Sequence, residues 1–228
     1  MRARRTVRKW SRQFMSEVAR RRSPREVIAV ADRLLEIDRY RFATEAKAAI
    51  ARAAMGHLPP AHGSVLLDGG STTGCLAAAM SAAAREGALE PVTVVTNSPS
   101  AGVELSHARD VEVLLLGGRL RPVTETVVGA QTNALLSSIS ADVAFLGSNG
   151  LSAVLGLTTP DAEEAAAKRL IAARSQRVIA LVDSTKFGAE HLCTFADLSA
   201  IDVLITDAVP PSSLAEALNR AEIEVVIA

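Results

Sequence analysis

The sequence predicts an α/β domain with a mainly parallel, twisted sheet and helices on both of its faces. Two observations lead to this fold class. Short apolar runs of four to six residues recur along the chain, and each ends on a polar or glycine cluster, as expected of strands that are buried on both faces. Ala-rich stretches with the length of helices fill most of the gaps between the runs, and such alternation is typical of right-handed crossovers in a parallel sheet.

Each apolar run is a predicted strand, and each Ala-rich stretch is a predicted helix. Alanine supports the helical assignment because it is the strongest helix former. The predicted strands are residues 65–68, 92–96, 111–116, 142–146, 178–182, 203–206 and 224–227. The predicted helices are residues 45–56, 75–86, 99–108, 130–139, 161–174 and 212–221.

Length and composition restrict the class of protein. The chain has 228 residues, of which 49% are hydrophobic, enough for one domain or for one domain with a small appendage. No apolar run reaches the length of a membrane span, and the Arg-rich start leads into no signal-peptide pattern. Cys75 and Cys193 have no CxxC or CxxH companion, which argues against a zinc site or a disulfide scaffold. A cytoplasmic protein fits these features best.

The zero net charge hides a strong asymmetry along the chain. Residues 1–41 contain 13 Lys and Arg and 5 Asp and Glu, whereas residues 42–228 contain 12 and 20. A basic block of this kind marks a nucleic-acid arm, a partner-binding segment or a solvated tail. We therefore predict a basic N-terminal segment over residues 1–44 and the α/β domain over residues 45–228.

The loops that follow the strands are the places to search for a binding site, because ligands of such sheets lie beyond the carboxyl ends of the strands. The first of these loops is Asp68-Gly69-Gly70-Ser71-Thr72-Thr73-Gly74. Its glycines allow close backbone approach, its hydroxyls add donors, and the start of the next helix offers unpaired N–H groups. A phosphate or carboxylate cradle is one interpretation. The alternative is a glycine turn in which a hydroxyl group caps the helix.

Further strand ends add polar groups. Thr96 and Asn97 form what is by itself an ordinary turn, and Gly118 with Arg119 could present a guanidinium group to an anion. We interpret Arg121 as a solvated surface residue. Asn149 lies in the loop after the fourth strand, and Lys186, in the loop after the fifth, is the best cationic candidate.

The loop after the fourth predicted strand leads to a helix with paired charges at residues 161–174. Thr159 is suited to cap this helix, Pro160 to its first position and Asp161 to its positive end. Glu164 and Lys168 are four residues apart and can pair on one helix face, where an exposed pair is usually only solvated.

The same loops argue against enzyme chemistry. The four histidines have no metal-ligand spacing, and none lies in a strand-end cluster. Among these loops only Asp68 and Asp183 supply carboxylates, so the mixture of hydroxyl, amide and cationic groups suits the binding of an anionic polyol better than its transformation. We predict no catalytic residue, no metal and no cofactor.

The order and spacing of these motifs resemble the ligand-sensing domain of the DeoR family of bacterial transcriptional regulators. The resemblance covers about residues 45–228. It rests on residues 45–51, the loop at 68–73, residues 95–97, residues 116–119, Gly147-Ser148-Asn149-Gly150-Leu151, residues 156–161, Glu164, Lys168, Asp183-Ser184-Thr185-Lys186-Phe187-Gly188 and residues 201–207.

The resemblance implies a fold related to ribose-5-phosphate isomerases and CoA-transferases, and a domain that senses a phosphorylated sugar or related metabolite. It also implies a repressor of sugar-use genes with an N-terminal winged helix-turn-helix that binds DNA, and self-association as dimers or tetramers. Carried over by position, residues 69–73 would hold the phosphate, and Asn97, Arg119, Asn149 and Lys186 would face the ligand. The full set of expected ligand-binding residues is Asp68, Gly69, Gly70, Ser71, Thr72, Thr73, Thr96, Asn97, Gly118, Arg119, Asn149, Lys168 and Lys186.

The sequence departs from the family at its start. The residues before the sensor-like region are too few for the family's winged helix-turn-helix, which leaves three explanations: a truncated or altered DNA-binding domain, a misassigned start, or a different basic arm. The positive charge of the N-terminal segment supports a salt-sensitive attraction to the phosphate backbone of nucleic acids. Two alternatives to the regulator stay open, namely an isomerase-like enzyme that uses Asp68, Asp183 or Glu164, and a sensor that has lost its own DNA binding.

Overall fold

A computed structural model describes residues 44–228 of the chain. Residues Ala43–Ala228 group into one compact unit by their contacts. The basic segment lies outside the described residues, so the division of the chain at residue 44 stays a prediction. None of the described helices is long and apolar enough to cross a membrane.

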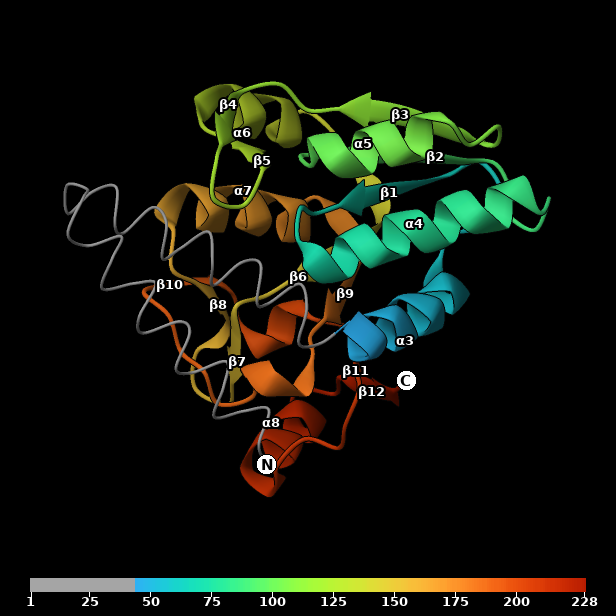
Figure 1. Ribbon diagram of the computed structural model, residues 1–228. Helices are drawn as coiled ribbons and strands as arrows, with labels where there is room; N and C mark the ends of the chain where they lie inside the picture. Colours follow the sequence, from blue (N-terminus) through green and yellow to red (C-terminus); the bar gives the residue numbers. More distant parts are fainter. Residues whose placement is uncertain (1–43) are drawn as a thin grey trace, which may run out of the picture. The chain divides into compact units, whose positions relative to one another are not determined.

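A parallel sheet of seven strands forms the centre of this unit (Figure 1). Its strand order is β12-β11-β9-β6-β1-β2-β3, and every neighbouring pair is parallel. All seven strands predicted from the apolar runs belong to it, so the predicted fold class is confirmed. The strands are β1 (Gly63–Leu67), β2 (Val92–Thr96), β3 (Val111–Leu115), β6 (Ala141–Gly147), β9 (Ser175–Leu181), β11 (Val203–Thr206) and β12 (Glu224–Ile227).

Within residues 44–228, six α-helices cover the two faces of the sheet, three on each face. The first three pack against one apolar cluster, and the last three pack against the other. They are α3 (Thr44–Ala54), α4 (Ser71–Arg85), α5 (Pro99–Ser106), α6 (Ala130–Ser137), α7 (Ala162–Ala173) and α8 (Ser212–Arg220). Short 3-10 helices are η1 (Met55–His57), η2 (Ser184–Lys186) and η3 (Leu198–Ala200).

The alternation of side chains along the central strands explains why their sequences are apolar throughout. On β6, Val143 and Phe145 belong to one core cluster, whereas Ala144 and Leu146 belong to the other. Successive residues of a strand point to opposite faces, so a strand covered by helices on both sides needs apolar residues at every position.

The winding of the chain reverses between the neighbouring strands β1 and β6. From β1 the chain proceeds through β2 to β3 at one edge, and it later returns to β6 and proceeds through β9 and β11 to the other edge. At such a reversal the loops after the two strands separate and leave room for a ligand. The loops after β1 and β6 are those that begin at Asp68 and Ser148.

Two small antiparallel sheets were not predicted from the sequence. A hairpin joins β4 (Arg119–Arg121) to β5 (Thr126–Val128), and a three-stranded sheet has the order β10-β8-β7. Strands of three or four residues with polar members lack the apolar run that marks the central strands. The strands of the three-stranded sheet are β7 (Gly150–Ser152), β8 (Gly156–Thr159) and β10 (Cys193–Ala196).

The prediction that Thr159 caps the following helix is wrong. Thr159 is the last residue of β8, and Asp161 caps α7 instead, where its Oδ1 accepts 3.0 Å hydrogen bonds from the N–H groups of Glu163 and Glu164. Asp161 has the extended backbone of a capping residue, with φ −109° and ψ 131°, so α7 begins at Ala162 and Pro160 precedes the cap instead of taking the predicted first helical position.

Candidate functional site

The loop after β1 leads into a helix whose first N–H groups are open. In the described part of the chain, the N–H groups of Ser71, Thr72 and Thr73 have no hydrogen-bond acceptor, and Gly70, which precedes α4, offers no capping side chain. The Thr73 hydroxyl group turns back and donates to the Gly70 carbonyl at 3.0 Å. Open N–H groups and the positive end of a helix dipole together favour an anion at this position.

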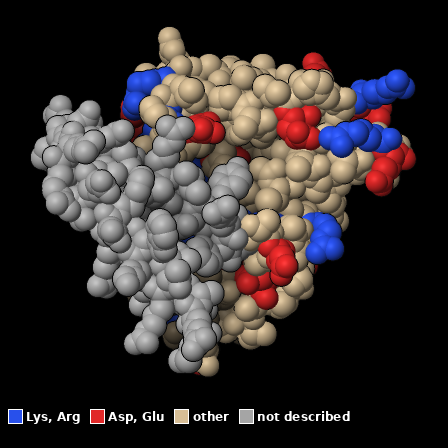
Figure 2. Space-filling model, in the orientation of Figure 1, with Lys and Arg blue, Asp and Glu red and all other residues tan. Residues whose placement is uncertain are grey.

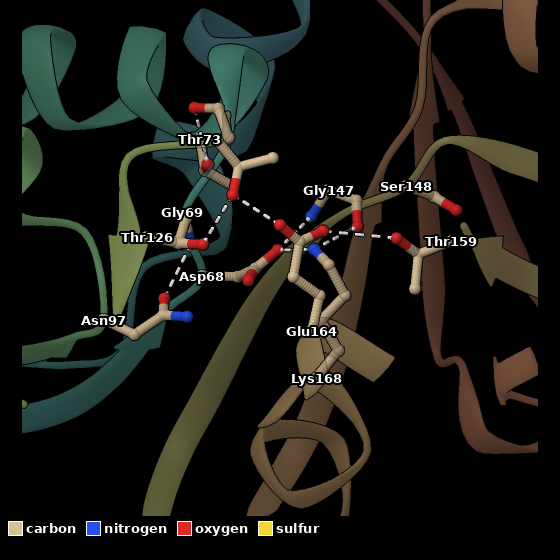
Figure 3. Close-up of polar contacts among 12 residues, drawn as sticks. Asp68, Gly69, Thr73, Asn97, Thr126, Gly147, Ser148, Thr159, Glu164 and Lys168 are labelled. Atoms are coloured by element: carbon tan, nitrogen blue, oxygen red, sulfur yellow. Dashed lines mark hydrogen bonds and ion pairs between the residues drawn. The ribbon is translucent and has the colours of Figure 1, made fainter. Parts of the chain in front are cut away.

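Asn97 holds this loop in place. Its Oδ1 accepts from Gly69 N at 2.9 Å, and its Nδ2 donates to Val127 O at 3.3 Å, so both ends of the buried amide are engaged by the backbone (Figure 3). The loop packs closely, because a Cβ atom at Gly69 would lie 2.2 Å from Thr126 Cγ2. Asn97 therefore positions the loop, and its expected place facing the ligand stays a prediction.

Thr96 and Gly118 also have structural partners. The Thr96 hydroxyl group accepts from Ser98 N at 3.0 Å in a buried turn. Gly118 has a φ of +146° and packs so closely that a Cβ atom there would lie 2.3 Å from Thr132 Oγ1. Both residues shape the strand ends around the site.

A buried ion pair joins α7 to the end of β1. Lys168 Nζ contacts Asp68 Oδ2 and donates to Gly147 O at 3.0 Å, and Gly147 N donates to Asp68 Oδ2 at 3.2 Å. The ammonium group also lies 5.3 Å from the centre of the Phe195 ring. Burial raises the pKa of Asp68 above its usual value, and the attraction of Lys168 opposes this shift.

A second charged cluster surrounds Glu164, one helical turn before Lys168. Arg121 donates to Glu164 Oε1 at 3.0 Å and to Asp161 Oδ2 at 3.2 Å, and the Thr124 hydroxyl group also donates to Oε1. Two predictions are therefore wrong: Arg121 is half-buried and paired, and Glu164 and Lys168 are not a solvated pair. Glu164 binds Arg121 of the β4–β5 hairpin, and Lys168 binds Asp68 after β1. Both side chains therefore pair with residues across a buried interface and not with each other along the helix.

The loop after β6 contributes Asn149. Its Oδ1 accepts from Thr159 Oγ1 at 3.1 Å, and the same hydroxyl group lies 3.3 Å from Glu164 Oε2. Figure 3 shows Asp68, Glu164, Lys168 and Thr159 directed toward one another, with Gly69 on the neighbouring loop and Thr73 in the first turn of α4. The predicted loops after β1 and β6 thus meet at one edge of the sheet.

The two remaining cationic candidates lie outside this buried cluster. Arg119 is exposed, with 60% of its side chain accessible, and pairs with Glu163 in the first turn of α7. Lys186 lies in η2, in a loop that packs on β7 through a 2.8 Å bond from Gly188 N to Leu151 O. Its ammonium group forms no polar contact with any described residue, and Lys168 supplies the buried cation instead.

Sequence reasoning misassigned Arg121 as a surface residue and missed Thr124 and Thr126, which also belong to the β4–β5 hairpin. The Thr126 hydroxyl group lies 2.9 Å from that of Thr124, which extends the chain of polar groups beyond Glu164. The sequence signal for the two threonines is weak, because Thr124 lies in the turn before β5 and only Thr126 belongs to the strand. The acidic residues at the start of α7 are a second signal, because they predict a Lys or Arg side chain nearby.

A hollow of about 540 Å³ lies at the opposite edge of the sheet, where strands β6 and β9 begin. Its lining includes His57, Arg177, Asp142 and Asp202. The two carboxylates accept hydrogen bonds from backbone N–H groups, Asp142 from Ser64 at 2.8 Å and Asp202 from Val178 at 2.6 Å. Asp142 and Asp202 thus bind backbone groups where β6 and β11 begin, and none of the expected ligand-binding residues lines this hollow. Among the described residues no group of three or more His, Cys, Asp or Glu side chains could hold a metal ion.

Comparison with known proteins decides the family. Residues 43–208 match the family described as the DeoR C terminal sensor domain. The chain belongs to the DeoR family. DeoR regulators similar to it include the HTH-type transcriptional regulator GlpR of Haloferax volcanii, which is 36% identical over 183 residues that cover 80% of this chain and 68% of the relative.

Other DeoR relatives are repressors by name. The glycerol-3-phosphate regulon repressor of Escherichia coli K12 is 30% identical, over 82% of this chain and 71% of its own length. The putative aga operon transcriptional repressor of Escherichia coli O157:H7 is 30% identical, over 83% and 68%. This DeoR chain is therefore a relative of carbohydrate-related transcriptional repressors.

Solved structures resemble part of this DeoR fold. A D-ribose-5-phosphate isomerase in complex with phospho-erythronic acid has a TM-score of 0.48 and 19% identity, over 63% of this chain and 54% of the isomerase. The delta subunit of eIF2B from Chaetomium thermophilum has a TM-score of 0.44 and 21% identity, over 64% and 50%. The expected relation to CoA-transferases stays a prediction.

Proposed function

We propose that the α/β domain binds a phosphorylated sugar or related anionic metabolite as an effector, and that binding controls the attachment of this regulator to DNA. The open N–H groups at the start of α4 carry the proposal. They lie next to Asp68 in sequence and are held in place by Asn97. One of the relatives, the glycerol-3-phosphate regulon repressor, has a phosphorylated polyol in its name, which supports this class of effector.

The carboxylates of Asp68 and Glu164 already pair with neighbouring side chains, which favours binding of the effector without catalysis. Asp68 pairs with Lys168, and Glu164 accepts from Arg121 and Thr124 through Oε1, so each carboxylate already has a structural partner. The convergence of Asp68, Glu164 and Lys168 is nevertheless the one observation that favours the isomerase-like alternative. Turnover of ribose 5-phosphate that disappears in Glu164→Gln would support that alternative.

DNA contact would come from the basic segment of residues 1–41. In the described part of the chain, Figure 2 shows Lys and Arg beside Asp and Glu on the visible face, rather than a continuous basic surface. Phosphate-backbone attraction weakens steeply with salt, so gel-shift titration of the full chain in low and moderate salt measures it. A chain that binds no DNA in low salt would instead be a sensor that acts by pairing with intact relatives.

The regulator is proposed to work in the cytoplasm as a homodimer or homotetramer. Two-fold assemblies suit the two-fold symmetry of operator DNA. Light scattering of the full chain measures its mass, and a monomer at micromolar concentration would contradict this part of the proposal.

Effector binding is tested by thermal unfolding with a panel of phosphorylated sugars. A ligand at one hundred times its dissociation constant stabilises the folded state by about 2.7 kcal/mol, so a bound effector raises the melting temperature. Ser71→Asp places a carboxylate at the first residue of α4 and is expected to abolish the shift by repulsion. Ser212→Asp makes the same change at the first residue of α8 and is expected to preserve it.

The control matters because an acidic residue stabilises either helix start in the absence of ligand. If no phosphorylated sugar shifts the wild-type melting temperature at millimolar concentration, the proposed function is wrong. If Ser71→Asp and Ser212→Asp reduce the ligand-induced shift in melting temperature equally, the anion does not bind specifically at the start of α4.

A further inference from the structure

Strand β3 forms one edge of the central sheet, and its outer side has no partner among the described residues (Figure 1). The backbone of Leu116, which follows β3, faces the neighbouring strand β2, because its N–H group donates to Thr96 O at 2.8 Å. Backbone groups alternate between the two sides of a strand, so the N–H and C=O groups of Val113 and Leu115 face outward. Within residues 44–228 no group bonds to them from that side.

This edge is apolar as well as open. Exposed edge strands usually carry a lysine, a proline or a bulge that prevents further pairing, but β3 contains no Lys or Pro, and its register with β2 is regular. Leu114 is 42% exposed and Leu115 is 44% exposed. Leu115 also packs against Gly102 of α5, and the next residue of that helix, Val103, is 60% exposed. Open backbone groups and neighbouring apolar side chains together mark a surface for association.

We propose that two copies of this chain associate through β3, in an antiparallel strand pair that joins their central sheets across a two-fold axis. The inference rests on the homodimer or homotetramer of the proposed function and adds the surface that forms it. A two-fold axis brings the same surface of both copies together, so the edge must be complementary to itself.

The open backbone groups of β3 are complementary to themselves when Leu114 lies at the axis. Val113 of each copy then lies opposite Leu115 of the other copy, and the two residues exchange both of their hydrogen bonds, as in any antiparallel ladder. The two Leu114 residues form the non-hydrogen-bonded pair at the centre, where Cα atoms approach to about 4.5 Å. Every outward group of Val113 and Leu115 is thereby bonded, and each exposed leucine is buried by the second copy.

Charge along the edge supports the antiparallel arrangement. Arg109, Asp110 and Glu112 give the start of β3 one more acidic than basic group, and Arg119 follows its end. An antiparallel pair places the start of each β3 beside the end of the other. The acidic excess of one copy therefore lies near Arg119 of the second copy, and opposite charges across such an interface fix its orientation.

The other edge of the sheet, strand β12, is a weaker candidate and serves as the control. Val225 and Ile227 are partly exposed there, but the adjoining helix α8 has no exposed large apolar side chain that would extend this surface. Pairing of β3 with β12 of the next copy would not close and would continue into a fibre. Self-pairing of β3 gives a closed assembly instead.

The mass of the full chain in solution tests the surface. Leu114→Glu places two carboxylates opposite each other at the axis, beside Glu112, and is expected to halve the mass measured for wild type at the same concentration. Val225→Glu makes the same change on β12 at a similarly exposed residue, 37% against 42%, and is expected to keep the wild-type mass. Sedimentation measures the mass, and thermal unfolding confirms that both variants fold.

Disulfide cross-linking tests the register and does not depend on the charged variant. Leu114→Cys brings two equivalent thiols together at the axis, at a separation that a disulfide can bridge. Mild oxidation with oxidised glutathione is expected to convert most of this variant into a covalent dimer on a non-reducing gel. Val225→Cys is expected to cross-link no more than wild type, which measures the contribution of Cys75 and Cys193.

The outcomes separate this inference from the proposed function. A retained mass in Leu114→Glu overturns the inference and leaves self-association standing, as does a Leu114→Cys variant that cross-links no more than Val225→Cys. A halved mass in Val225→Glu assigns the interface to β12 and also overturns it. If Leu114→Glu fails to fold, the cross-link decides. A monomeric wild type overturns the proposed assembly together with this inference, whereas effector binding is measured independently.

Discussion

At the scale of single residues, the site is defined by buried charges and their partners. Asp68 and Lys168 are 100 positions apart in the sequence and are almost fully buried together. Removing one member of such a pair leaves an uncompensated charge in the interior, which is more costly than replacing both. This pair is therefore the most sensitive point of the site.

Lys168→Met is expected to lower the free energy of unfolding by about 3 kcal/mol near neutral pH. Burial already raises the pKa of Asp68, and loss of the lysine raises this pKa further because its attraction lowers it. An acid with a raised pKa in the folded state loses stability as pH rises through that pKa. The deficit of the variant should thus be smaller at pH 5 than at pH 7.5.

Urea unfolding at the two pH values measures this deficit. The double variant with Asp68→Asn removes the buried charge and should recover part of the loss. A deficit that is equal at both pH values would show that the cost comes from lost packing rather than from Asp68.

At the scale of elements, α7 and the β4–β5 hairpin were predictable to different degrees. The helix follows from its Ala-rich sequence, and the prediction that Glu164 and Lys168 share a face respects its geometry. The hairpin, with strands of three residues each, was missed. The partners of α7 were missed with it, because Arg121 and Thr124 belong to that hairpin.

Gly118 tests how the start of this hairpin packs. Gly118→Ala is expected to destabilise the protein by about 2 kcal/mol or more, because its φ of +146° is strained for other residues and a Cβ atom would overlap Thr132 Oγ1. Gly117→Ala is the control, since a Cβ atom there meets nothing within 4 Å, and its effect should stay below about 1 kcal/mol. Chemical denaturation compares the two. Similar losses would contradict the tight packing at Gly118.

At the scale of the whole described unit, two apolar clusters hold the sheet between its helices. Phe145 is the largest of the fully buried side chains and lies in the middle strand of the seven. Phe145→Ala is expected to cost about 3 to 5 kcal/mol, as large-to-small changes in a packed core do. Val154→Ala removes an apolar side chain that is 83% exposed and should be nearly neutral. Thermal unfolding of both variants measures the contrast, and a small effect at Phe145 would contradict a tightly packed core.

The sequence by itself determined the seven central strands, the six helices and the edge of the sheet at which the polar loops gather. This was possible because the central strands are apolar runs and the helices are Ala-rich, so local patterns were enough. The tertiary structure alone decided which charges pair. Glu164 and Lys168 are neighbours on a helix, yet each binds an element distant in sequence, since burial rewards the partner that approaches from across the packed interface.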